Sequence, residues 1–131
     1  MPHLTLEYTG NLAELDVRRT LVSLNTALME SGHFEGRDIK SRAFRLSDYL
    51  VGDSFGAGAF AHVTLRLLSG RSTEVKADLA RRLLGALTDS ARRNGATAVQ
   101  LGLIAVMTFV SIFYLLCMVG VLMLRDSVKH L

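Results

Sequence analysis

The stretch Met1-Pro2-His3-Leu4-Thr5-Leu6-Glu7-Tyr8-Thr9-Gly10 opens the chain, and the rest of the fold is organised around it. Its apolar residues Leu4, Leu6 and Tyr8 alternate with polar ones. Alternation of this kind predicts a β-strand with one buried face. The strand starts directly after Pro2, so the proline is held at the end of a rigid element.

Pro2 is a candidate general base. Removal of Met1 would leave a secondary amine at the start of the chain, and an α-amino group has an ordinary pKa of about 8. Apolar surroundings and nearby cations lower this pKa because they disfavour the protonated form. A proline in this position is also common where it only permits removal of Met1, so the assignment needs support from the rest of the chain.

An internal repeat appears when the sequence is shifted by 59 positions. His3-Leu4-Thr5-Leu6 then matches His62-Val63-Thr64-Leu65. Further along, Leu24, Ala27 and Leu28 match Leu83, Ala86 and Leu87. The chain is therefore interpreted as one unit used twice, over about residues 1–47 and 59–105.

Each unit predicts a strand, a helix and a strand. In the first unit Asn11 is the expected N-cap of a helix that ends near Gly32, and its apolar residues follow helical spacing: Leu12, Leu15, Leu21, Leu24 and Leu28. Residues 38–46 alternate and predict the second strand. Because the helix is long enough to cross over, the two strands should be parallel.

The second unit follows a loop over residues 48–58, which contains three glycines. It predicts a strand over 59–68, a helix from Ser72 to near Gly95 and a strand from Thr97. The result is an α/β fold with a four-stranded sheet and two helices on one face. The helices cover only one face of the sheet, so we expect other subunits to contact the second face and the protein to form an oligomer. The polar residues expected on that second face are His3, Thr5, His62, Thr64 and Arg66.

Composition and charge argue against several classes of function. The 131 residues fit one domain, and a net charge of +3 without a Lys/Arg run argues against a nucleic-acid partner. Cys117 is the one cysteine and the four histidines are scattered, so we expect neither an internal disulfide nor a metal site. The N-terminus has no secretory signal pattern, which favours a cytoplasmic enzyme body.

Four motifs resemble the tautomerase superfamily, and within it 5-carboxymethyl-2-hydroxymuconate isomerase. They are Met1 to Glu7, Ile39-Lys40-Ser41-Arg42, Phe60-Ala61-His62-Val63 and Ser69-Gly70-Arg71-Ser72. The resemblance covers residues 1 to about 101. It implies a homotrimer with active sites near subunit boundaries and a cofactor-free reaction that moves a proton between two positions of a conjugated dienol acid.

The same resemblance implies roles for individual residues. Pro2 would take the enol proton and return it to a carbon, while Arg71, Arg42 and Lys40 would hold substrate carboxylates and the developing enolate charge. Phe60 would line the pocket or pack at a subunit interface. Without the resemblance, a lone arginine on a strand is more often a solvated or salt-bridged surface residue, and Arg71 could serve only to close a turn. The repeat-related His3 and His62 favour packing on the sheet face or at an interface over catalysis.

The resemblance ends where a long apolar segment begins, at residues 101–124. No charge lies between Arg93 and Arg125, and about 20 apolar residues suffice for a membrane-spanning helix. Three interpretations stay open: a membrane-spanning helix that tethers the 1–100 domain, a strand followed by a helix buried between subunits, or an altered reading frame or engineered sequence. The polar tail, 125–131, again resembles the family.

The main functional hypothesis is a cofactor-free isomerase acting on an unsaturated 2-hydroxy di- or tricarboxylate from aromatic breakdown. One alternative is a related hydratase or dehalogenase in which a protonated Pro2 acts as an acid. Another is a non-catalytic, membrane-tethered binding subunit. Retention of Met1 would favour the last, because it blocks the only base that the sequence offers.

Overall fold

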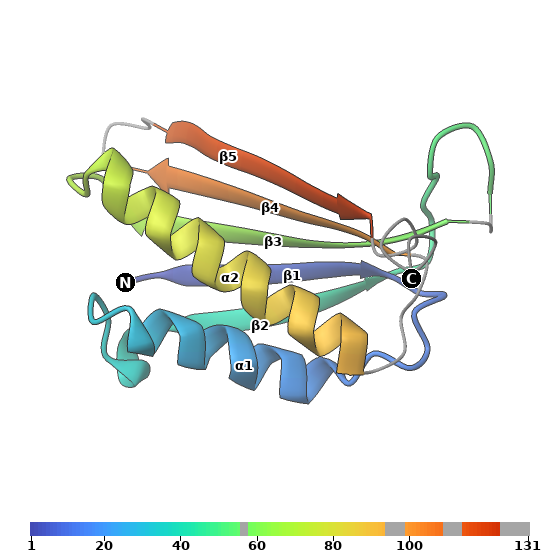
Figure 1. Cartoon of the computed structure of the whole chain (residues 1–131), viewed down its shortest axis with the longest axis horizontal. Helices are drawn as coiled ribbons and strands as arrows, with labels where there is room; N and C mark the ends of the chain where they lie inside the picture. Colours follow the sequence, from blue (N-terminus) through green and yellow to red (C-terminus); the bar gives the residue numbers. More distant parts are fainter. Residues whose placement is uncertain (56–57, 94–98, 109–113, 124–131) are drawn as a thin grey trace.

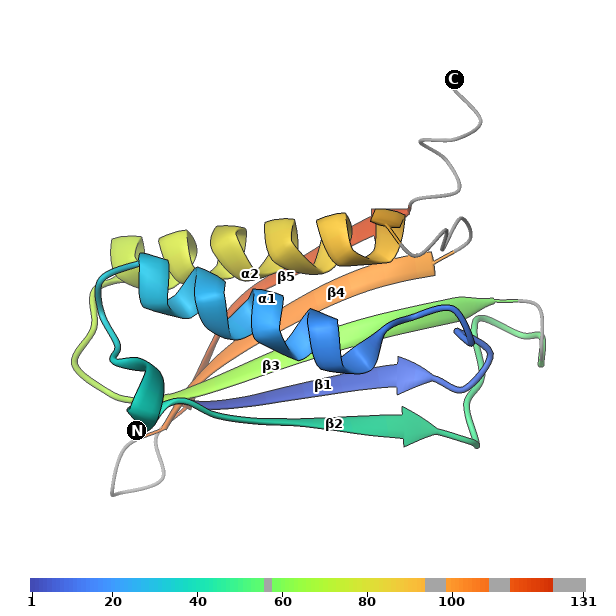
Figure 2. The same ribbon diagram turned by 90° about the horizontal axis from the view of Figure 1, so that it is seen from below.

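The computed structural model of the chain describes residues 1–55, 58–93, 99–108 and 114–123. Its elements are β1 (His3–Thr9), α1 (Val17–Glu30), the 3-10 helix η1 (Gly36–Asp38), β2 (Lys40–Leu46), β3 (Ala59–Leu68), α2 (Thr73–Arg93), β4 (Val99–Thr108) and β5 (Tyr114–Met123). The strands form one sheet in the order β2-β1-β3-β4-β5. Both helices lie on the same side of it (Figures 1 and 2).

The strand pairing confirms the duplicated strand-helix-strand fold. β1 pairs in parallel with β2, and β3 pairs in parallel with β4. The two units join through the antiparallel pair β1 and β3, in which Thr5 lies opposite Thr64. These threonines are equivalent positions of the repeat, so the units are related by an approximate two-fold axis through this pair.

The core lies between the sheet and the two helices. Alternation along β1 and β3 directs Leu4, Leu6, Val63 and Leu65 inward, each at most 1% exposed. The helices contribute repeat-related leucines that are all fully buried: Leu24, Leu28, Leu83 and Leu87. Burial of each such side chain is worth about 1.5–3 kcal/mol, so this shared interior is what holds the helices on the sheet.

The start of α1 differs from the prediction. Asp16, and not Asn11, is the N-cap, and its carboxylate accepts a hydrogen bond of 3.1 Å from the Arg19 backbone N–H. The Asn11 side chain instead donates to the Gly58 backbone oxygen at 2.8 Å, which ties the segment after β1 to the end of the loop that precedes β3. Asn and Asp cap helices about equally well, so residue type alone does not locate the cap.

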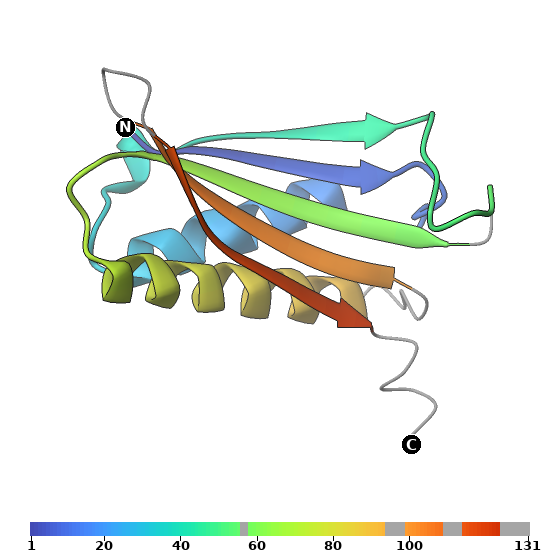
Figure 3. The same cartoon turned by 90° about the horizontal axis from the view of Figure 1, so that it is seen from above.

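The predicted four-stranded sheet gains a fifth strand from the apolar segment. β5 pairs antiparallel with β4 at the sheet edge, with a register irregularity between Ile104 and Val106 (Figure 3). The strand that one interpretation placed at the start of residues 101–124 is present as part of β4. The described residues 114–123 form β5, where that interpretation and the membrane-spanning one both placed a helix. Periodicity cannot separate a buried strand from a buried helix in a continuous apolar run.

No helix in the described ranges is both long and apolar enough to cross a membrane. The start of the fourth strand at Thr97 and the polar tail, 125–131, were predicted at positions that lie outside the described residues.

Truncation of Leu24 tests the packing of α1 on the sheet. Leu24→Ala should lower the free energy of unfolding by about 2–5 kcal/mol, because it removes buried methyl groups and leaves a cavity. Val22 lies on the same helix and is 65% exposed, so Val22→Ala should change this free energy by less than about 0.5 kcal/mol. Urea unfolding followed by circular dichroism, at one protein concentration, measures the free energy of unfolding of both variants. Equal decreases in the two variants would contradict the packing of Leu24 in the core.

Candidate functional site

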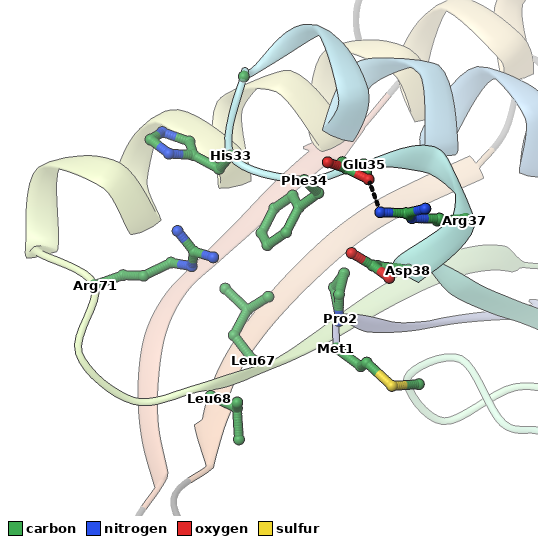
Figure 4. A pocket seen from close by; sticks show the side chains of 11 residues that line it. Met1, Pro2, His33, Phe34, Glu35, Arg37, Asp38, Leu67, Leu68 and Arg71 are labelled. Atoms are coloured by element: carbon green, nitrogen blue, oxygen red, sulfur yellow. Dashed lines mark ion pairs between the residues drawn. The ribbon is translucent and has the colours of Figure 1, made fainter.

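A cavity of about 490 Å³ lies at the N-terminal end of β1 (Figure 4). Its walls come from both repeat units: the start of the chain, the segment that follows α1, and the segment from the end of β3 to the start of α2. The lining residues are Met1, Pro2, Gly32, His33, Phe34, Glu35, Arg37, Asp38, Leu67, Leu68 and Arg71. The structure thus brings two of the predicted site residues, Pro2 and Arg71, to one cavity.

Pro2 is buried at this cavity, whereas Met1 is 61% exposed. The Lys40 backbone N–H donates a hydrogen bond of 3.0 Å to the Pro2 carbonyl, which fixes the proline against the start of β2. With Met1 attached, the Pro2 nitrogen belongs to an amide and has no basic lone pair. Removal of Met1 would place a secondary amine in a partly apolar wall, the surroundings that lower an amine pKa.

Arg71 reaches the cavity from the turn between β3 and α2. Gly70 makes this turn with φ +113°, a conformation that favours glycine. The next residue, Ser72, accepts a hydrogen bond of 3.2 Å from the Val75 backbone N–H and so caps α2. The Arg71 guanidinium carbon then lies 4.6 Å from the centroid of the Phe34 ring, within the range of a cation–π contact.

Several charged residues of the cavity were not predicted from the sequence. Arg37 and Glu35 form an ion pair of 2.8 Å, which engages the Arg37 guanidinium. Asp38, at the end of η1, projects toward Pro2 (Figure 4). These residues occupy an irregular segment without periodicity or a motif. The only signal in the sequence is their position at or just before the start of the second predicted strand, 38–46, which in the structure begins at Lys40.

Arg42 lies apart from Arg71. It projects on the open face of the sheet, where its Nη2 donates to His3 Nδ1 at 3.0 Å. A second cavity, of about 700 Å³, lies there and is lined by Met1, His3, Arg42, Arg66, Leu67 and Leu68. Met1, Leu67 and Leu68 line both cavities, so the first residue of the chain forms part of the wall between them.

The remaining predicted site residues lie outside the Pro2 cavity within this chain. Lys40 is exposed, and its Nζ donates to the Arg37 backbone oxygen at 2.5 Å. Phe60 lies at the far end of β3, where its backbone N–H donates to Thr9 Oγ1 at 3.1 Å. Because Thr9 ends β1 and Pro2 precedes its start, the length of that strand separates Phe60 from Pro2.

The chain matches the family model for 5-carboxymethyl-2-hydroxymuconate isomerase over residues 2–108. A solved 5-carboxymethyl-2-hydroxymuconate isomerase from Deinococcus radiodurans R1 is 40% identical with a TM-score of 0.70, over 81% of this chain and 80% of that one. No curated protein sequence matches the chain.

Two more distant solved structures share the fold. A 5-carboxymethyl-2-hydroxymuconate delta-isomerase is 23% identical with a TM-score of 0.72, over 82% of each chain. A fused 4-OT wild-type symmetric trimer is 21% identical with a TM-score of 0.59, over 88% of this chain and 95% of that one.

His62 provides a pH test of the open sheet face. Burial lowers its pKa below the ordinary 6.5, an effect that the carboxylate of Glu7 partly opposes. The unfolded chain therefore binds more protons at this position than the folded chain does. The free energy of unfolding is thus highest above pH 6.5 and decreases as the pH falls from there through the lowered pKa of His62. His62→Gln should flatten the pH dependence of the melting temperature in this window. An unchanged slope would show that His62 does not cause it.

Proposed function

The chain belongs to the 5-carboxymethyl-2-hydroxymuconate isomerase family, and from this we propose that it moves a proton along an unsaturated 2-hydroxy di- or tricarboxylate, with Pro2 as the general base. The observation that carries the proposal is the meeting of Pro2 and Arg71 at one cavity. One residue supplies a base once Met1 is removed, and the other supplies a fork of donors for a carboxylate.

The reaction needs no atoms beyond those of the substrate and Pro2. The Pro2 amine takes the enol proton, the O–H electron pair forms the C=O bond, and the double bonds shift along the conjugated chain. The distal carbon then takes the same proton back from the Pro2 ammonium. Arg71 holds a carboxylate and stabilises the negative charge that spreads through the dienolate.

Two charges act on the Pro2 amine in opposite directions. Arg71 disfavours the protonated form and would lower its pKa, as does the partly apolar wall. Asp38 favours the protonated form, but its side chain is exposed and solvent screens its field. The proposed reaction requires the neutral amine, which is the state that a general base needs.

We propose a homotrimer as the active assembly, as in the fused 4-OT symmetric trimer of the same fold. The open face of the sheet supports an oligomer, because His3, Thr5, His62 and Thr64 are only partly exposed there and no described element covers them (Figure 3). Phe60 would then act in the Pro2 cavity of a neighbouring subunit. Arg42 and Lys40 stay candidates for a second carboxylate, because both lie near the start of β2.

Pro2 variants test the base. Pro2→Ala should lower kcat for a dienol such as 5-carboxymethyl-2-hydroxymuconate while the circular dichroism spectrum is retained, because a primary amine is a different and more flexible base. One extra residue before Pro2 in the mature chain should abolish turnover, because it converts the amine to an amide. Intact-mass analysis establishes in each preparation whether Met1 is removed. An extended enzyme with full activity would require another base.

Arginine variants test carboxylate binding. Arg71→Ala should lower kcat/KM by roughly 10–100 fold, in line with about 1.5–3 kcal/mol for a charge-assisted hydrogen bond. If Arg42 binds a second carboxylate, Arg42→Ala should lower kcat/KM by a similar factor. Arg37→Ala is the matched control, because its exposed ion pair with Glu35 engages the guanidinium, and it should cost less than about threefold.

The substrate supplies a second control for these arginines. A variant that removes the partner of one carboxylate should lower kcat/KM less for a substrate that lacks this carboxylate than for the full substrate. Equal losses with both substrates would assign the arginines to the fold and not to binding.

A further inference from the structure

The contact between Arg71 and Phe34 sets this guanidinium apart from the other arginine of the cavity. Arg71 lies over the face of the Phe34 ring at 4.6 Å, whereas Arg37 is paired with the Glu35 carboxylate at 2.8 Å. Among the described residues no ion pair of Arg71 with a carboxylate is found. Figure 4 shows the side chains of Arg71 and Phe34 pointing toward each other at the cavity wall.

Phe34 is itself held in place. It follows α1 in the segment before η1 and packs, partly buried, against the main core cluster. The His33 ring approaches it edge-on, with centroids 6.3 Å apart and an interplanar angle of 67°. The ring is therefore a fixed surface, in contrast to the exposed backbone turn that carries Arg71.

An aromatic partner has a consequence that a carboxylate partner lacks. The ring attracts the guanidinium through its quadrupole but does not neutralise the charge. An aromatic ring offers no oxygen to accept hydrogen bonds, so a guanidinium that lies over it keeps N–H donors available to a ligand. A carboxylate in the same place would occupy those donors and compete with the carboxylate of a substrate.

We propose that Phe34 is a positioning residue that pre-orients Arg71 for a substrate carboxylate while leaving its charge and donors free. This inference rests on the proposed function and deepens it, because it assigns the recognition of a carboxylate to the Arg71–Phe34 pair and not to a lone arginine. Ordering the arginine in advance removes part of the entropy cost of binding. Phe34 therefore acts on substrate binding and not on proton transfer.

The test is a double-mutant cycle on Phe34 and Arg71 in the full chain. Phe34→Leu should raise KM for a dicarboxylate dienol about 3–10 fold with kcat within about twofold, while Phe34→Tyr, which keeps the ring, should restore the wild-type KM. In the Arg71→Ala background Phe34→Leu should have no further effect on KM. Phe55→Leu, at a ring 81% exposed and outside the cavity, is the matched control and should leave KM unchanged.

Binding of trans,trans-muconate, a six-carbon unsaturated dicarboxylate without the enol, separates this inference from the proposed function. Calorimetry should show weaker muconate binding in Phe34→Leu and normal binding in Phe34→Tyr, even in a chain that fails to isomerise a dienol. These muconate affinities would uphold the Arg71–Phe34 pair. The failure to isomerise a dienol would then reject only the proposed reaction.

Three results would overturn the pair. One is an effect of Phe34→Leu that persists in the Arg71→Ala background, which would make the ring purely structural. The second is a Phe34→Tyr variant as impaired as Phe34→Leu. The third is an unchanged KM and an unchanged muconate affinity in Phe34→Leu. If Phe34→Leu does not fold, Phe34→Met, which keeps most of the volume without a ring, takes its place in the same cycle.

Discussion

The antiparallel pairing of β1 with β3 is the constraint on which the rest of the structure depends. Thr5 lies opposite Thr64, so equivalent positions of the two units meet at the centre of the sheet. With this register both strands direct their leucines and valines toward the same side, where both helices must then pack. A shift by one residue would turn every one of these side chains to the opposite face, so the buried leucines themselves fix the register.

The same pairing builds the candidate site from both units but only once in each chain. Antiparallel strands bring the start of β1 beside the end of β3, which places Pro2 next to the turn that carries Arg71. At the related end of the repeat, the equivalents of Pro2 and Arg71 are Ala61 and Leu12. Neither has a basic group, so the two equivalent positions at the other end of the sheet do not repeat the combination of Pro2 and Arg71.

The two edges of the sheet differ, although the four strands β2, β1, β3 and β4 follow the repeat. β2 remains an edge strand and carries three basic residues, Lys40, Arg42 and Arg45, of a kind that discourages uncontrolled pairing with other chains. On the other edge β5 covers β4 along most of its length. The apolar segment thus satisfies the backbone groups of β4 and at the same time breaks the symmetry of the duplication.

The sequence by itself determined the elements that repeat a local pattern: the alternation of β1 and β3, the leucine spacing of both helices, and the duplication that relates them. It also predicted Pro2 and Arg71 as site residues from short, contiguous motifs, and the structure brings both to one cavity. Only the tertiary structure decided that Asp16 caps α1, that residues 114–123 form a strand, and that Arg42 lies on the opposite face from Arg71. The contact of Phe34 with Arg71 joins residues far apart in the chain. Local patterns carry no information on such a contact, because it depends on how β3, α1 and the turns at their ends pack together.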